Sequence, residues 1–141
     1  YERALVRGWH LGAAANQDNH QANWGSANTL RTGVFMESLT LENLYKALRA
    51  RHTFETEDAD VKIYFEGNGA MMGDILYDLD RVTFRVEYSD PGDTILEAQA
   101  IYSGGVLTLP VQGDVWETTF SLSIDKPYEW DIIRVEQDDS N

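Results

Sequence analysis

The hydrophobic pattern of the chain changes its period near residue 56, and this change constrains the fold more than any other feature. Beyond that point apolar and polar residues alternate, as in Val61-Lys62-Ile63-Tyr64-Phe65. A period of two places every second side chain on the same face, which is the pattern of a β-strand with one buried side. Similar runs recur as far as Val135. The pattern predicts six or seven strands in an antiparallel, immunoglobulin-like β-sandwich.

Short turn signals separate the expected strands. Asn68-Gly69 is typical of a two-residue hairpin, and further turns are expected at Asp90-Pro91-Gly92, Gly104-Gly105 and Lys126-Pro127. The strands expected between them cover residues 61–66, 82–88, 95–102, 106–109, 120–124 and 130–135. The polar tail from Asp138 to Asn141 is expected to be frayed.

Residues 1–56 follow a different pattern and are expected to form a separate part, with the sandwich at 57–141. A helix end before Gly8 and a short buried strand over Leu11–Ala15 are expected first. The clearest element is a helix at about 41–51, because Thr40 is a good N-cap. Its apolar face is formed by Leu41, Leu44, Tyr45 and Leu48. We expect this face to pack on the sandwich or on the link at residues 53–60. The fold class is therefore mainly β, of the α+β type.

The charge of the chain excludes some classes of partner. The formal net charge is -13, which argues against nucleic acid because phosphates require a basic surface. The charge is uneven: residues 1–51 hold six basic and four acidic side chains, and residues 52–141 hold five and twenty. No apolar run is long enough to span a bilayer, and the chain contains no cysteine. In the acidic part, Asp78 and Asp80 have a spacing that suits a Ca²⁺ site, although a solvated acidic surface explains them as well.

Asp18 and His20 are the strongest candidates for functional residues in the chain. They lie two positions apart after the small apolar run Leu11–Ala15, so their side chains are expected on one side of the chain. Carboxylate and imidazole groups both bind Zn, Mn or Fe, but two ligands are too few for a hydrolytic site. A polar turn is the alternative explanation. The Arg31 guanidinium is suited to bind an anionic substrate group, and the alternative is a structural bond to an acid or a loop carbonyl. The Trp24 ring could stack on a substrate, and the alternative is packing within the protein.

The motifs around this pair resemble those of a known family. The series consists of Asp18-Asn19-His20, Trp24-Gly25, Arg31-Thr32-Gly33, Leu39-Thr40, Ala47 to Arg51, Thr56-Glu57-Asp58, Asn68-Gly69 and Met72-Gly73. It resembles the C-terminal part of metallohydrolases of the PHP superfamily, named after polymerase and histidinol phosphatase, and most closely the CehA/McbA type. The resemblance covers about residues 5–77.

The resemblance implies that residues 1–56 contain the last strand and loop of a (β/α) barrel, followed by the capping helix. It implies that Asp18 and His20 are the final Asp-x-His metal ligands, and that the complete protein hydrolyses phosphoesters or related esters with divalent Mn, Zn or Fe. The opening His-x-His and the middle ligands of the family are missing here, since the other histidines are His10 and His52. The chain alone is therefore expected to hold no metal firmly and to be inactive.

Two functions follow as hypotheses. In the first, the chain is the C-terminal fragment of a metal-dependent hydrolase, and its partners are the missing N-terminal barrel portion and a small ester substrate. The exposed barrel remnant could also form the contact surface of a homo-oligomer. In the second, the chain is a non-catalytic sandwich that binds carbohydrate or protein. Aromatic side chains gathered on one sandwich face would favour the second; the candidates are Tyr64, Tyr77, Tyr88, Tyr102, Trp116 and Trp130.

Overall fold

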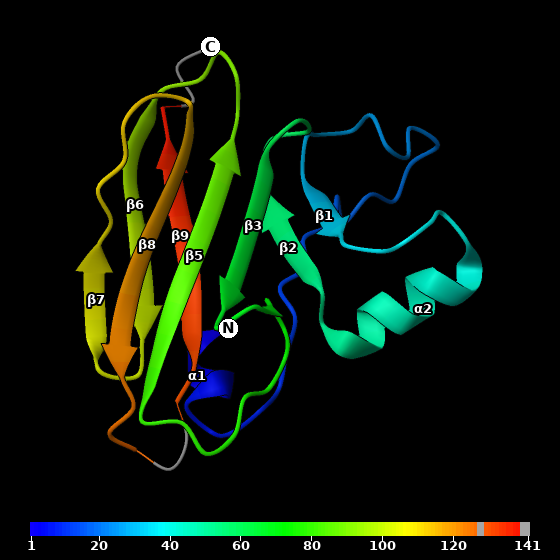
Figure 1. The fold of residues 1–141 in the computed structure, drawn as a ribbon. Helices are drawn as coiled ribbons and strands as arrows, with labels where there is room; N and C mark the ends of the chain where they lie inside the picture. Colours follow the sequence, from blue (N-terminus) through cyan, green and yellow to red (C-terminus); the bar gives the residue numbers. More distant parts are fainter. Residues whose placement is uncertain (127–128, 139–141) are drawn as a thin grey trace.

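The computed structural model describes residues 1–126 and 129–138. It is mainly β, as predicted, and two antiparallel sheets face each other (Figure 1). One sheet has the strand order β4-β3-β5-β8 and the other β7-β6-β9. The strands are β3 (Lys62–Gly67), β4 (Ala70–Met71), β5 (Arg81–Ser89), β6 (Ile95–Tyr102), β7 (Gly105–Thr108), β8 (Val115–Ser123) and β9 (Asp131–Gln137).

The core of the sandwich lies between the two sheets, where the alternating residues predicted it. In β5 every second residue from Val82 to Tyr88 is buried. Ala98 and Ala100 of β6 are fully buried and belong to the same core cluster as Val86 and Tyr88 of β5. Such small side chains let the two sheets approach closely. The Tyr88 ring stacks on Trp116 of β8, with 5.4 Å between the ring centroids. These buried side chains form the core that joins the two sheets.

The predicted turns are confirmed wherever the structure describes them. Asn68 and Gly69 have φ angles of 50° and 83°, which are the left-handed angles that a tight type I′ hairpin requires. Asp90-Pro91-Gly92 connects β5 to β6, and Gly104-Gly105 connects β6 to β7. Pro127 of the predicted turn and residues 139–141 of the predicted tail lie outside the described residues.

Strand β8 begins earlier than predicted, at Val115 instead of about 120. Val115 and Trp116 are adjacent apolar residues, so they interrupt the alternation that marks the other strands. Pairing with β5 nevertheless continues from Arg81–Ser123 to Ser89–Val115. The burial of Trp116 against Tyr88 explains the longer strand.

The N-terminal part contains α1 (Glu2–Leu5), β1 (Arg31–Val34), α2 (Leu41–Ala50) and β2 (Thr53–Thr56). Strands β1 and β2 form a separate antiparallel pair, and Figure 1 shows them with α2 on the side of the molecule away from β7. The predicted strand at 11–15 is wrong, because residues 9–20 have no regular secondary structure. The backbone of Ala15 bonds to the side chain of Thr32 instead of joining a strand ladder.

Helix α2 is confirmed, but its predicted packing is corrected. The Thr40 hydroxyl accepts a hydrogen bond from the Asn43 amide, as an N-cap does. Ala47 is buried and Leu44 is half-buried. Leu41, Tyr45 and Leu48 are instead 66%, 50% and 44% exposed. The helix packs on the side of Leu44 and Ala47, so most of its apolar face lies in solvent.

Three contacts join the C-terminal end of α2 and β1 to the sandwich. The Arg51 guanidinium donates from Nε to the Gly73 carbonyl at 2.9 Å, and His52 Nε2 lies 2.9 Å from Asp74 Oδ1. Phe35 packs edge-on against Tyr64 of β3, with 5.7 Å between the ring centroids. These contacts fix the N-terminal part beside β3.

In the described ranges, no helix combines the length and the apolar character needed to cross a membrane.

Candidate functional site

The segment between Ala15 and Thr32 is a closed loop whose two ends are joined by one side chain. Thr32 lies on β1, and its hydroxyl donates to the Ala15 carbonyl at 2.7 Å and accepts from the Ala15 amide at 3.0 Å. A side chain that bonds both backbone groups of one residue fixes the distance between two chain segments. We call residues 16–30 the site loop. Its base is thus attached to the β1–β2 pair.

Two further side chains hold the inside of the site loop. Gln17 donates to the Asn28 carbonyl at 2.6 Å and accepts from the Gly25 amide at 2.8 Å. Arg31 donates to the carbonyls of Asn28, Leu30 and Gly25 at 2.8–3.0 Å. Backbone groups in a loop without strand or helix need such partners. The loop therefore has a defined shape although it contains no regular secondary structure.

Asp18 and His20 are brought together at the outside of this loop. Asp18 Oδ1 lies 3.5 Å from His20 Nε2, and the two side chains are 90% and 85% exposed. The Asp18 amide donates to Asn16 Oδ1 at 2.8 Å, and the Asp18 backbone has a left-handed φ of 45°. This turn, which Asp tolerates better than most residues, directs the carboxylate toward the imidazole.

The separation of the two donor atoms suits a shared metal ion. Two donors bound to one tetrahedral zinc ion at about 2.1 Å lie about 3.4 Å apart, and the observed separation is 3.5 Å. Both donor atoms also face solvent, so further ligands have room to approach. The chain itself supplies two donors at this position, and a hydrolytic metal site requires at least three protein ligands.

Trp24 and Arg31 line the same open depression as the Asp–His pair. The depression has a volume of about 540 Å³ and is bordered by residues 15–20 on one side and by Trp24, Gly25 and residues 30–32 on the other. Trp24 is 76% exposed. Arg31 thus makes the bonds to loop carbonyls that were the alternative to anion binding. Substrate binding by Arg31 and Trp24 stays a prediction.

His52 is explained by its structural contact with Asp74 at the joint between α2 and the sandwich. His10 lies in the irregular segment before the site loop. The structure therefore brings neither of these histidines into the closely spaced pair formed by Asp18 and His20.

The sandwich carries a cluster of three aspartate carboxylates that the sequence analysis missed. Oxygen atoms of Asp58, Asp90 and Asp93 lie within 4.8 Å of one another. Asp90 is almost fully buried and accepts hydrogen bonds from the Tyr88 hydroxyl and from Gln137 Nε2. Burial raises the pKa of Asp90, and the charges of Asp58 and Asp93 act in the same direction. The Asp90-Pro91-Gly92-Asp93 turn was a signal for two of these three residues, but Asp58 comes from a distant segment.

Carboxylate oxygens are the donors that Ca²⁺ takes, so this group is chemically able to hold a divalent cation. Exposed acidic groups are common without an ion, and the group receives no functional assignment on its geometry alone. It contains neither Asp78 nor Asp80, the pair that the sequence singled out for Ca²⁺.

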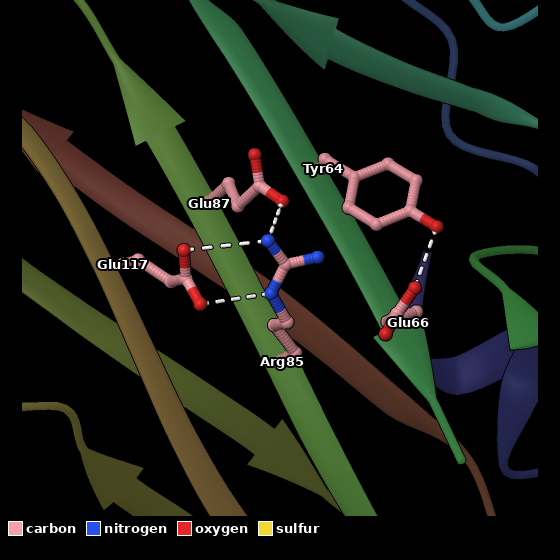
Figure 2. Close-up of polar contacts among 5 residues, drawn as sticks. All are labelled: Tyr64, Glu66, Arg85, Glu87 and Glu117. Carbon is pink, nitrogen blue, oxygen red and sulfur yellow. Dashed lines mark hydrogen bonds and ion pairs between the residues drawn. The ribbon is translucent and has the colours of Figure 1, made fainter. Parts of the chain in front are cut away.

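The outer face of β3, β5 and β8 is occupied by paired polar groups (Figure 2). Arg85 donates from Nε and Nη2 to the Glu117 carboxylate at 2.8 and 3.3 Å and also pairs with Glu87. The Arg85 hydrogen bond lowers the pKa of Glu117. The Tyr64 hydroxyl donates to Glu66 at 2.7 Å, and this bond raises the pKa of Tyr64. Each of these carboxylates therefore has a hydrogen-bonding or ionic partner on the surface of the sheet.

The aromatic residues that would favour a carbohydrate-binding sandwich do not form one exposed face. Tyr88 and Trp116 stack on each other in the core. Tyr64 packs against Phe35, and Tyr102 and Trp130 are half-buried. Tyr77 is strongly exposed, but it lies in the loop before β5. A flat aromatic platform of the kind that sugar rings stack on is therefore not built from these six residues.

Comparison with protein-family models, with curated proteins and with solved structures found no match to this chain.

Proposed function

We propose that the chain is the C-terminal part of a metal-dependent hydrolase of the PHP superfamily, of the CehA/McbA type. In this proposal Asp18 and His20 are two ligands of a divalent Mn, Zn or Fe ion, and the N-terminal barrel portion of the same protein supplies the others. The observation that carries the proposal is the 3.5 Å separation of two exposed donor atoms on a loop that its own hydrogen bonds hold in shape.

The proposal gives each part of the site loop a defined task. Asp18 and His20 hold the ion at the surface of the chain, where ligands from another part of the protein can reach it. Thr32, Gln17 and Arg31 position the loop, because their hydrogen bonds fix its base and its interior. Preorganised ligands bind a metal more tightly than mobile ones, since less motion is lost on binding.

The bound ion would supply a metal-bound hydroxide and would stabilise the negative charge that develops during ester hydrolysis. The substrate class is a small phosphoester or a related ester. In this proposal Trp24, which lines the depression, contacts the substrate. The sandwich is an accessory part, attached beside the site through Arg51, His52 and Phe35.

The alternative, a non-catalytic sandwich that binds carbohydrate or protein, has less support. Carbohydrate binding requires an exposed aromatic face, and the outer face of β3, β5 and β8 instead carries the Arg85 and Tyr64 pairs. The exposed apolar side chains on the other sheet, Leu96, Val106 and Leu107 of β6 and β7, are aliphatic.

The sequence upstream of Tyr1 in the gene tests the proposal first. The expected result is a His-x-His motif and further acidic and histidine ligands in an open reading frame continuous with this chain. An upstream sequence without such ligands would contradict the proposal.

Turnover of a p-nitrophenyl phosphodiester with Mn²⁺ or Zn²⁺ provides the second test. The 141-residue chain is expected to be silent, and the complete protein is expected to be active and to lose activity in His20→Ala. The control is His52→Ala, which removes an imidazole from the joint and leaves the Asp18–His20 pair intact. Metal-dependent turnover by the 141-residue chain that disappears in His20→Ala would mean that the site is complete without the barrel.

A further inference from the structure

Helix α2 has a second apolar side that the fold leaves uncovered. Leu41, Tyr45 and Leu48 are spaced by four and three positions, so they form one stripe along the helix. All three are exposed, at 66%, 50% and 44%. The helix is anchored on another side, where Ala47 is buried. An apolar stripe of this kind on a short helix marks a contact surface when its rim is polar.

Opposite charges lie along one edge of this stripe. Glu42 is in the first turn of α2 and Arg49 is in the last. Each directly follows a stripe residue, Leu41 or Leu48, so both are rotated by about 100° to the same side. The Arg49 guanidinium lies 5.8 Å from the centroid of the Tyr45 ring, which places this charge at the border of the stripe. Lys46, which follows Tyr45, lies on the same side between them and is paired with Glu37. The two ends of the edge therefore carry an acid and a base.

This arrangement is complementary to itself when two helices run in opposite directions. A two-fold axis near Tyr45 brings Leu41 of one copy to Leu48 of the other. The same axis brings Glu42 of each copy to Arg49 of the other, and it sets the two helix dipoles antiparallel. In a parallel pair the two-fold axis would run along the helices and would put the two Glu42–Arg49 edges on opposite sides of the interface, so these charges would not meet. The charge pattern thus favours a second copy of this chain in antiparallel orientation.

We propose that the exposed stripe of α2 is the contact surface of a homodimer, in which two α2 helices pack antiparallel. The helix has ten residues and is about 15 Å long. A pair of such helices buries less than the roughly 1,600 Å² of a standard stable interface, so the dimer is weak and reversible. The proposal concerns the 141-residue chain and does not rest on the metal site.

Sedimentation equilibrium between about 5 µM and about 500 µM tests the dimer directly. The average mass is expected to rise from one chain toward two over this range. Leu41→Glu and Leu48→Glu each place a charge in the stripe and are expected to weaken association at least about tenfold. The matched control is Leu96→Glu, which changes an exposed leucine on β6 and is expected to leave association unchanged.

A charge reversal tests the antiparallel orientation. Glu42→Arg is expected to weaken the dimer, and the double variant Glu42→Arg with Arg49→Glu is expected to restore it, because the pair is then reversed in both contacts. Circular dichroism melting of each variant checks that α2 and the sandwich remain folded.

A chain that stays monomeric throughout the concentration range would overturn the proposal and would assign the stripe to another partner, such as the rest of a larger hydrolase. A dimer that Leu96→Glu disrupts and Leu41→Glu does not would place the interface on the sandwich and would equally overturn it. Failure of the dimer leaves the metal proposal intact, since Asp18 and His20 lie outside the stripe.

Discussion

The Thr32 hydroxyl bonds both backbone groups of Ala15, donating to the carbonyl at 2.7 Å and accepting from the amide at 3.0 Å. One side chain thus closes a loop that begins and ends far apart in the sequence. The rest of the loop is held by Gln17 and Arg31. The position of Asp18 and His20 therefore depends on three polar side chains and not on a strand ladder.

Replacing Thr32 by Val is expected to loosen the site loop, because the shape is kept and both hydrogen bonds are lost. We expect a local cost of about 1–2 kcal/mol and faster amide exchange over residues 16–30. The protection of β5 and β8 should not change. Hydrogen exchange followed by NMR measures this. Thr83→Val is the control, since it removes a hydroxyl contact with Ser121 on the sandwich surface. Equal amide exchange of the site loop in wild type and in Thr32→Val would mean that the Thr32 hydrogen bonds do not hold the loop.

Gly73→Ala is expected to destabilise the joint between α2 and the sandwich. A Cβ at this position would lie 2.3 Å from the Arg51 carbonyl oxygen, and Gly73 has a φ of 92°. The left-handed backbone alone costs an alanine about 1–2 kcal/mol, and overpacking adds about 1–3 kcal/mol. Gly69→Ala is the matched control, because Gly69 has a φ of 83° and open space around it. Urea unfolding should show the larger loss for Gly73→Ala, and equal losses would refute a close contact with Arg51.

Leu44 and Leu48 of α2 are expected to differ in their effect on stability. Leu44 is half-buried, whereas Leu48 is 44% exposed. Leu44→Ala should lower the free energy of unfolding by about 1–2 kcal/mol, and Leu48→Ala by less than about 0.5 kcal/mol. Thermal unfolding at low protein concentration, where any dimer has dissociated, provides the measurement. Lys46→Ala is the control with an exposed side chain on the same helix. A larger loss for Leu48→Ala than for Leu44→Ala would reverse the packing direction described for α2.

Asp131 is expected to make stability fall as the pH rises. Its Oδ1 atom is buried without a hydrogen-bond partner, and burial, with a smaller contribution from Glu129, raises the pKa of Asp131 to about 7. The folded state thus binds the proton more tightly than the unfolded state, whose carboxyl has a pKa of about 3.9. The stabilisation is complete below pH 4 and is lost as the pH rises through 7.

Asp131→Asn removes this charge, so it should raise the free energy of unfolding at pH 8 by about 1–3 kcal/mol and change it little at pH 4. Denaturant unfolding at the two pH values measures the difference. Asp80→Asn makes the same substitution at an exposed position and serves as the control. An Asp131→Asn variant that shows the same gain at both pH values would refute the role of the ionised carboxyl.

The sandwich was predictable from the sequence because its signals are local. Alternation in β5 and β6 and the Asn68-Gly69 turn depend on neighbouring residues, and the bounds predicted for these two strands lie within one residue of those observed. The same reasoning placed α2 from its N-cap and its apolar spacing. It could not show which side of α2 is covered, because that depends on contacts with distant residues such as Gly73 and Asp74.

The candidate site was predictable only in part for the same reason. Asp18 and His20 are neighbours in sequence, so their proximity follows from local geometry. The closure by Thr32 and the grouping of Asp58 with Asp90 and Asp93 join distant segments. The small apolar residues before Asp18 suggested a strand, but the alternative partner for the Ala15 backbone, a threonine hydroxyl, has no signature in the local sequence.

The proposed function requires Asp18 and His20 to bind a divalent metal together, and a Zn²⁺ titration of the 141-residue chain followed by two-dimensional NMR measures this binding at the two side chains. The His20 imidazole and the amides of residues 16–20 are expected to shift first, with weak affinity because the chain offers two donors here. Both His20→Ala and Asp18→Asn should abolish these shifts. Shifts that begin at Asp58, Asp90 and Asp93 or at His52, or that persist at the site loop in Asp18→Asn, would contradict a metal site formed by the pair.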